Sequence, residues 1–182
     1  MKIISLLDID KFGLSSNYVQ NKVMQIFFLS SSKKEFRNDS EKDKFFNTWV
    51  MPYFNNYKNL FFIALNEKKE ILGYLSGCIN SLEFTKYSPH ESYLLFSDLF
   101  ENYNAHLHIN CDPNSRGTGV GTKLINYYVD VLESYSDVKG VHIITGPKSR
   151  NVNFYQSNDF SFLEERVLNN YSYLFMGKAI FS

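Results

Sequence analysis

One segment constrains the fold of this chain more than any other, because it joins a strand, a glycine-rich turn, a helix and a second strand in sequence. In residues 105–112, apolar and polar side chains alternate as they do in a half-buried strand. Residues 120–135 place apolar side chains along one helical stripe, and residues 141–145 form a short buried strand. A strand, a helix and a strand in this order predict a central, right-handed parallel βαβ unit.

The segments on either side of this unit show the spacing of further helices and strands. The expected elements are, in chain order, helices at 16–29 and around 45–53, a β-hairpin from strands at 60–65 and 71–77, a short helix within 91–101, a helix at 150–158, and a final pair of strands at 161–168 and 171–180. Residues 81–104 carry no readable functional signal. The pattern as a whole indicates a mixed α/β (α+β) fold.

Length and composition narrow the class of protein. A chain of 182 residues with 44% apolar residues is typical of one globular domain, which we take to span residues 1–182. Lysine plus arginine and aspartate plus glutamate both number 19, so the chain has no net field that would attract nucleic acid or an anionic membrane. The longest apolar runs, at 24–29 and 60–65, are far shorter than the roughly 20 residues of a membrane-spanning helix.

Cysteine usage and the N-terminus indicate the compartment. Cys78 and Cys111 are too few and too far apart for a disulfide framework or a four-ligand zinc site, so no metal is expected. The N-terminal stretch turns acidic at Asp8 and Asp10, too early for a secretory signal. A cytoplasmic protein with reduced thiols is the resulting prediction.

The glycine-rich turn, residues 112–123, is the most informative motif. Gly117, Gly119 and Gly121 alternate just before and within the start of the expected helix. Glycine lets main-chain amides at a helix N-terminus converge on an anion, aided by the helix dipole, so a phosphate or pyrophosphate is the expected guest. The spacing matches neither a nucleoside-triphosphate P-loop nor the dinucleotide fingerprint, which would need a glycine at Thr122.

The residues Arg116-Gly117-Thr118-Gly119-Val120-Gly121 match R-x-x-G-x-G, and a strand and Pro113 precede them. This motif resembles the acetyl-CoA loop of the GNAT superfamily of N-acetyltransferases. The order of elements over about residues 58–180 is similar to that family's, and the two N-terminal helices are in the corresponding place. The family's closing segment, N-x-x-A-x-x-F-Y-x-x-x-G-F, is matched by Phe154, Tyr155 and Phe160, whereas Lys148, Asn151 and Asp159 depart from it.

The resemblance implies a GNAT-like, mostly antiparallel sheet of six or seven strands flanked by about four helices. It further implies acetyl-CoA as co-substrate and direct transfer of the acetyl group to a primary amine, on a small molecule or a peptide, within a ternary complex. The residues that it assigns to CoA are Asn110 and Cys111, whose main chain orients the acetyl group between two splayed strands, and Arg116, Gly117, Thr118, Gly119, Val120, Gly121 and Thr122, which hold the pyrophosphate.

Three side chains are candidates for moving protons. Tyr155 is the candidate general acid, because a phenol with a pKa of roughly 10 can protonate a thiolate and stay neutral itself. The alternative interpretation is that Tyr155 only packs in the hydrophobic core. His106 and His108 are candidate bases on one face of the strand, although they lie one residue out of register with family members that use histidines there. Further candidate bases, acting through water, are Glu83, Glu101 and Asp112.

Several alternatives stay open. The chain could be a catalytically inactive module that binds acyl-CoA and regulates or interacts with other proteins, or a binding protein whose loop holds another phosphate or none. His142 and Cys111 fit packing roles better than catalysis. The strand at 171–180 would allow a homodimer if it lies at a sheet edge. Aromatic side chains in the first two helices form a core or line an acceptor pocket: Phe27, Phe28, Phe46, Trp49, Tyr53 and Phe54.

Overall fold

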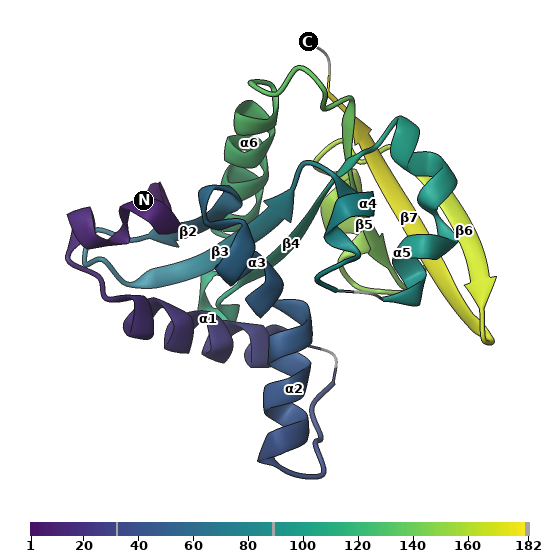
Figure 1. The fold of residues 1–182 in the computed structure, drawn as a ribbon. Helices are drawn as coiled ribbons and strands as arrows, with labels where there is room; N and C mark the ends of the chain where they lie inside the picture. The colour runs from purple at the N-terminus through teal and green to yellow at the C-terminus, as the bar shows by residue number, and fades with distance from the viewer. Residues whose placement is uncertain (32, 89, 181–182) are drawn as a thin grey trace. The chain divides into compact units, whose positions relative to one another are not determined.

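The computed structural model describes residues 1–31, 33–88 and 90–180, and its ribbon is shown in Figure 1. Seven strands in this part of the chain belong to one mixed, mostly antiparallel sheet, which confirms the predicted fold class. The chain forms two compact units: residues 1–77 with 108–128, and residues 78–107 with 129–182. Strand β4 (Ala105–Cys111) begins in the second unit and ends in the first.

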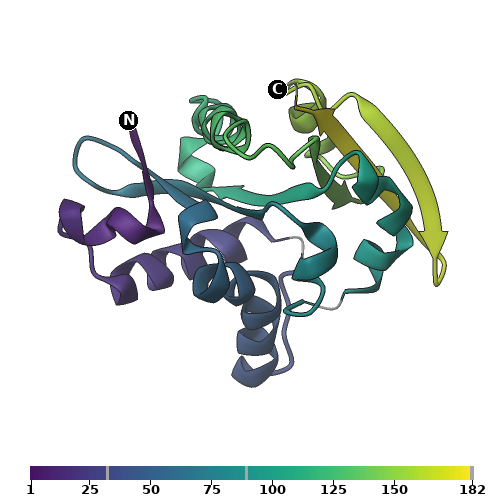
Figure 2. The ribbon, with the colours of Figure 1, turned by 45° about the horizontal axis from the view of Figure 1, so that its top comes forward.

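The strands of the first unit are antiparallel neighbours. β1 (Lys2–Ser5) pairs with β2 (Phe61–Leu65), which pairs with β3 (Ile71–Cys78), the predicted hairpin. The end of β4 follows β3, and the Asp112 N–H donates to the Leu72 carbonyl there. The helices of this unit are η1 (Leu6–Phe12), α1 (Ser16–Ser30), α2 (Asp39–Trp49), α3 (Met51–Asn56), η2 (Lys58–Leu60), η4 (Pro113–Ser115) and the first part of α6 (Val120–Leu132). Figure 2 shows α1 on one face of these strands and α6 on the other.

Helix α1 illustrates how local sequence determines an element. The Ser15 side chain accepts the Tyr18 N–H and caps the helix. Val19, Val23, Ile26 and Phe27 then recur at helical spacing and are all buried. The predicted helix at 16–29 is therefore confirmed, with its buried face turned to the core.

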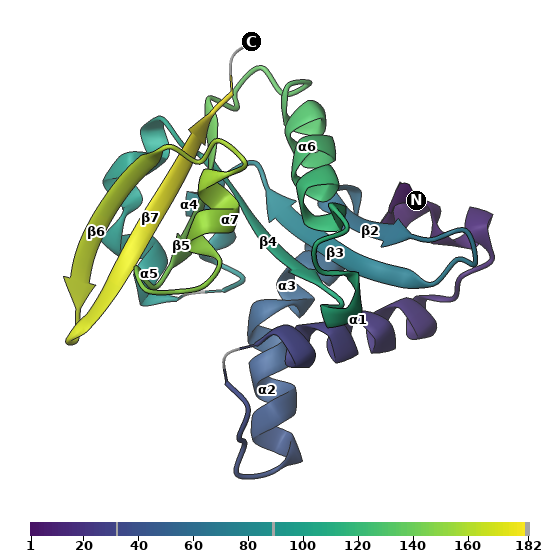
Figure 3. The same ribbon diagram turned by 180° about the vertical axis from the view of Figure 1, so that it is seen from behind.

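The second unit contains the parallel pair of the sheet. The start of β4 pairs with β5 (Gly140–Thr145), β5 with β7 (Tyr171–Ala179), and β7 with β6 (Phe162–Leu168). Figure 3 shows the β6–β7 hairpin from behind. The helices of the second unit are α4 (Ser81–Phe84), α5 (Glu91–Leu95), η3 (Ser97–Glu101), the rest of α6, and α7 (Val152–Gln156).

The final hairpin confirms one expectation and removes another. Asn169 and Asn170 form its turn as predicted, with φ angles of 50° and 65°, values that asparagine adopts more readily than most residues. However, β7 lies between β5 and β6, so the strand predicted at 171–180 has a neighbour on each side. A dimer that pairs through β7 would require β7 to lie at an edge of the sheet, and the strand at this edge is β6.

Two glycines of the second unit lie against the Tyr103 ring. A Cβ on Gly177 would lie 2.7 Å from Tyr103 Cε1, and one on Gly140 would lie 2.7 Å from Cδ1 of the same ring. Gly140 differs because its Cβ would also approach the main-chain oxygen of Asn102 to 2.6 Å. The Tyr103 ring also stacks on Phe162, with centroids 5.0 Å apart, so it is held over β5 and β7, the strands that contain Gly140 and Gly177.

We expect Gly177→Ala to destabilise the protein by about 1–3 kcal/mol, the usual cost of overpacking a filled core. In a Tyr103→Ala background the same substitution should cost much less, because the clashing atoms are gone. Gly140→Ala should keep part of its cost there, since the Asn102 backbone cannot move aside. Urea unfolding of the single and double variants measures these differences, and equal costs of Gly177→Ala in both backgrounds would contradict the packing explanation.

Candidate active site

The glycine loop lies between η4 and α6 in the first unit. Gly117 and Gly119 have φ angles of 74° and 79°, in the left-handed region that favours glycine. No atom lies within 4 Å of the Cβ that either would carry, so their requirement is conformational and the space beside them is open. Around them, Asp112 accepts the Asn114 N–H and the Thr118 hydroxyl donates to the Ser115 carbonyl at 2.6 Å. The loop is thus shaped by its own hydrogen bonds.

The start of α6 offers main-chain donors. The first N–H groups of a helix have no intrahelical acceptor, and here they belong to Val120, Gly121 and Thr122. The Val120 side chain is buried in the core, so only its amide could reach a ligand. The Arg116 side chain is exposed beside the loop. Together these groups form a positive, amide-rich surface suited to a pyrophosphate.

The end of β4 is positioned by main-chain contacts. A Cβ on Gly73 would lie 3.0 Å from both the Asn110 oxygen and Cys111 Sγ, so β3 approaches β4 very closely here. The Ser30 hydroxyl donates to the Cys111 carbonyl at 3.1 Å and ties the end of α1 to this segment. Burial raises the pKa of the Cys111 thiol to about 11, so it stays protonated near neutral pH and is a poor nucleophile.

The pairing between β4 and β5 is confined to the beginning of β4. It joins Ala105 to Val141 and His106 to His142, whereas β4 runs on to Cys111. A parallel pair that stops after two residues leaves main-chain groups of the strand end available for other partners.

His108 lies on β4 among aromatic rings of the first unit. Its ring centroid is 5.9 Å from those of Phe27 and Tyr74. The Asn110 amide nitrogen is 2.9 Å from the Tyr74 hydroxyl and 3.3 Å from His108 Nε2. His108 Nδ1 is buried and has no hydrogen-bond partner among the described residues. Burial lowers the pKa of His108 to about 4, so the imidazole is neutral near pH 7 and can accept a proton, although as a weak base.

His106 is enclosed in the second unit. It is 1% exposed, and its Nδ1 lies 2.8 Å from Ser81 Oγ and 3.1 Å from Cys78 Sγ. The Phe84 ring lies 4.7 Å from it at a steep angle. Burial raises the pKa of the Cys78 thiol to about 12, so no thiolate is available beside it. These contacts favour a packing role for His106 over proton exchange with a substrate.

His142 is also a core residue. Its ring stacks on Phe175 and Phe100, with centroids 4.5 Å and 4.9 Å away, and its Nδ1 donates to the Tyr103 carbonyl. Burial lowers its pKa to about 3. The environment fits the packing role expected from the sequence.

Tyr155 lies in α7, at the segment that departs from the family pattern. Its carbonyl accepts the N–H groups of Asn158 and Phe160, and its ring packs 5.4 Å from that of Phe160. Asp159, where the pattern has glycine, has a φ of 67°; aspartate reaches this left-handed conformation more easily than most residues. Lys178 Nζ lies 3.2 Å from the Asp159 carboxylate. The departure at 159 therefore preserves the local backbone.

Among the other two departures and the alternative bases, Asn151, Asp112 and Glu83 have local partners, and Lys148 and Glu101 are exposed. Asn151 accepts the Thr145 hydroxyl at 3.1 Å, and Lys148 is exposed. Asp112 caps the turn before the loop, as described above, and Glu83 lies 3.9 Å from Lys86. The loop, Asn110, Cys111 and His108 share the first unit, whereas His106 and Tyr155 belong to the second. Their meeting around one thioester stays a prediction.

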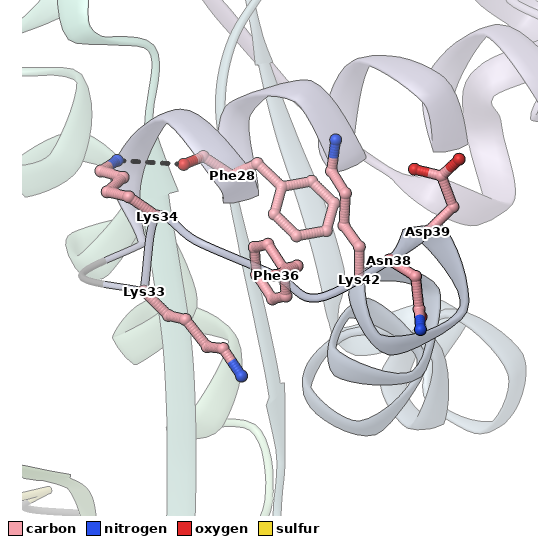
Figure 4. Close-up of a pocket in the computed structure, with 7 residues that line it drawn as sticks. All are labelled: Phe28, Lys33, Lys34, Phe36, Asn38, Asp39 and Lys42. Atoms are coloured by element: carbon pink, nitrogen blue, oxygen red, sulfur yellow. Dashed lines mark hydrogen bonds between the residues drawn. The ribbon is translucent and has the colours of Figure 1, made fainter.

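Two features of the molecule were not predicted from the sequence: a basic pocket and a partly buried polar pair. The pocket is lined by Phe28, Lys33, Lys34, Phe36, Asn38, Asp39 and Lys42 and is shown in Figure 4. The sequence feature that could have indicated the pocket is the adjacent pair Lys33 and Lys34, in a polar stretch that is typical of a loop. Of the aromatic residues considered for an acceptor pocket, Phe28 lines it, while Phe27, Phe46, Tyr53 and Phe54 are buried. The polar pair is Tyr74 with Asn110, whose contact no local pattern predicts.

Comparisons with known proteins identify the family. A family model described as the acetyltransferase (GNAT) family matches residues 23–160. No curated protein matches the chain. Among solved structures, a protein named SsHAT is 17% identical with a TM-score of 0.70, covering 100% of this chain and 98% of that one. PH1933 from Pyrococcus horikoshii is 17% identical with a TM-score of 0.69, covering 98% and 97%.

A third structure carries a ligand. An aminoglycoside 6'-N-acetyltransferase complexed with coenzyme A is 12% identical with a TM-score of 0.64, covering 100% of this chain and 98% of that one. At these identities the solved structures show the shared fold. Because the family model spans most of the sequence, the chain belongs to the GNAT acetyltransferase family. Within the described residues, no helix has the length and apolar character needed to cross a membrane.

Proposed function

We propose that this protein transfers an acetyl group from acetyl-CoA to a primary amine, by direct attack of the amine on the thioester in a ternary complex. The observation that carries the proposal is the glycine loop, where two left-handed glycines precede a 13-residue helix that follows β4 and η4 in a member of this family. The CoA complex of the aminoglycoside acetyltransferase with this fold supports the choice of co-substrate.

The loop would hold the pyrophosphate of CoA. The amides of Val120, Gly121 and Thr122 at the start of α6 would supply hydrogen-bond donors, and the dipole of α6 and the Arg116 guanidinium would supply positive charge. The missing side chains at Gly117 and Gly119 leave room for the phosphates to approach the main chain.

The end of β4 would receive the pantetheine arm and the acetyl group. The main chain of Asn110 and Cys111 would orient the thioester carbonyl, and an amide donor there would stabilise the oxyanion that forms. The short β4–β5 pairing supports this role, because it stops well before these residues.

Proton transfer completes the reaction. The amine nitrogen attacks the carbonyl carbon and loses a proton to a base, the C–S bond breaks, and the leaving thiolate takes a proton from the Tyr155 hydroxyl. His108 is the better of the two histidine candidates for the base, because the Nε2 of its neutral ring faces the Asn110 amide as an acceptor and keeps a lone pair for the proton, whereas His106 is enclosed. The free thiols Cys78 and Cys111 fit the cytoplasmic location that we also propose.

The test is a calorimetric titration with acetyl-CoA, followed by a thiol assay for CoA release with a panel of amines. Saturable binding and amine-dependent release would support the proposal. Binding without release for any amine would replace it by an acyl-CoA-binding module. Absence of binding to the folded protein would overturn it and leave the loop as a turn or a site for another anion.

A further inference from the structure

The basic pocket at the junction of α1 and α2 is a second candidate binding site. It has a volume of about 310 Å³ and is lined by seven residues, three of them lysines. Figure 4 shows the rings of Phe28 and Phe36 side by side, with the Lys42 side chain next to them, Lys33 below, and the Lys34 ammonium directed to the Phe28 carbonyl. The two rings meet edge to face, with centroids 5.6 Å apart. The pocket therefore combines an apolar wall with positive charge.

This pocket is connected to the residues proposed to orient the acetyl group. Phe28 precedes Ser30 by two residues, about 3 Å along the helix axis, and the two side chains project from nearly opposite sides of α1. Ser30 donates its hydroxyl to the Cys111 carbonyl, and the neighbouring Phe27 ring contacts His108. All of these residues belong to the first unit. A ligand in the pocket thus lies at the end of α1 that is tied to the thioester segment.

The charges lining the pocket do not cancel. Three lysines face one carboxylate, Asp39, so the lining carries a net charge of +2 (three positive minus one negative) in a chain whose net charge is zero. Lys33 is paired with Glu41 at 2.9 Å, and Lys34 donates to the carbonyls of Phe28 and Leu29. Among the described residues, no carboxylate lies within ion-pair distance of Lys42.

Lys42 lies where a ligand would contact both the positive charge and the aromatic wall of the pocket. Its Nζ lies 4.9 Å from the centre of the Phe28 ring, a cation–π distance. An anion bound by Lys42 would therefore lie at the edge of the aromatic wall. An apolar or aromatic body attached to that anion could pack on Phe28 and Phe36.

We propose that this pocket binds the anionic group of the acceptor, so that the acceptor is an amine that also carries a carboxylate or a phosphate on an apolar body. This inference rests on the proposed acetyl transfer. The same positive charge would repel polyamines and aminoglycosides, which have several ammonium groups and no anion.

The activity test compares acceptors that share a body and differ in the anion, with kcat/KM expressed per neutral amine because the anion also raises the pKa of the amine. L-Phenylalanine and L-phenylalaninamide have the same body, and O-phosphoethanolamine and ethanolamine form the phosphate arm. We expect kcat/KM to be at least about tenfold higher for the anionic member of one pair, and spermidine to be a poor acceptor. Lys42→Glu should remove this preference. Lys44→Glu is the matched control, because Lys44 is exposed on the same helix and outside the pocket lining.

A binding test needs no turnover. Trp49 is the single tryptophan of the chain, and its ring contacts Phe45, which contacts Phe36 of the pocket wall. Titration with 3-phenylpropionate and with phenyl phosphate, neither of which has an amine, should change the tryptophan fluorescence saturably. The neutral 3-phenylpropanamide should not. Lys42→Glu should weaken the response about tenfold, and Lys44→Glu should not.

The outcomes separate this inference from the proposed function. Acetyl transfer that prefers neutral or cationic amines, with no effect of Lys42→Glu, would overturn the anion site and leave the acetyltransferase intact. Failure to bind acetyl-CoA, combined with anion binding that depends on Lys42, would remove the enzyme activity and with it the acceptor role of the pocket. Absence of any fluorescence response to either anion, together with equal turnover within both pairs, would also overturn the inference.

Discussion

Replacing Gly119 with aspartate is expected to weaken acetyl-CoA binding by a factor of about 100 or more. The carboxylate would stand in the open space beside the first turn of α6, where the pyrophosphate is proposed to lie. Placing a carboxylate against a bound pyrophosphate brings like charges together, which costs several kcal/mol of binding free energy, and each 1.4 kcal/mol is about a factor of ten in affinity. Calorimetric titration with acetyl-CoA measures the change.

Two control variants separate repulsion from backbone strain. Gly119→Ala puts a Cβ on a residue with a φ of 79° and should cost about 1 kcal/mol of stability, with a smaller loss of affinity. Gly13→Asp introduces the same charge at a φ of 72° in a different loop, also with open space around the Cβ, and should leave binding unchanged. If Gly119→Asp binds as well as Gly119→Ala, the pyrophosphate does not lie at this loop.

Tyr155→Phe should lower kcat for acetyl transfer by about 10²–10⁴, the usual contribution of a positioned general acid. The substitution removes only the hydroxyl and keeps the ring that packs on Phe154 and Phe160. The dissociation constant for acetyl-CoA and the thermal midpoint should therefore change little. Steady-state kinetics at saturating acetyl-CoA measures the effect on kcat.

The matched control for this variant is Tyr128→Phe, which removes a hydroxyl from another buried tyrosine, on α6. It should leave kcat within about twofold. Equal kcat for Tyr155→Phe and the unaltered protein would show that Tyr155 is a core residue and that water protonates the leaving thiolate.

Elements determined by local sequence could be predicted, and those determined by distant contacts could not. The helix capped by Ser15 and the turn at Asn169-Asn170 follow from short-range rules and are confirmed. β1 was missed because four residues are too few to show a period, and it forms only by pairing with β2, some sixty residues later. The interior position of β7 likewise depends on β5 and β6, which no pattern within 171–180 reveals.

The same distinction applies to the candidate site. The glycine loop could be predicted from the sequence because left-handed backbone angles favour glycine at particular positions. The lysines of the basic pocket could not be singled out in this way, because a charged surface residue is ordinary until the fold shows that Phe28 and Phe36 lie beside it. The aspartate at 159 departs from the family pattern in sequence, and its backbone lies in the left-handed region that glycine adopts readily.

The close approach at Gly73 has a consequence for how this enzyme family can diverge. A Cβ at position 73 would lie 3.0 Å from the main-chain oxygen of Asn110 and from Cys111 Sγ, and 3.1 Å from Cys111 Cα, so a residue larger than glycine would displace the end of β4. Selection would therefore act most strictly on the bare glycine of the neighbouring strand.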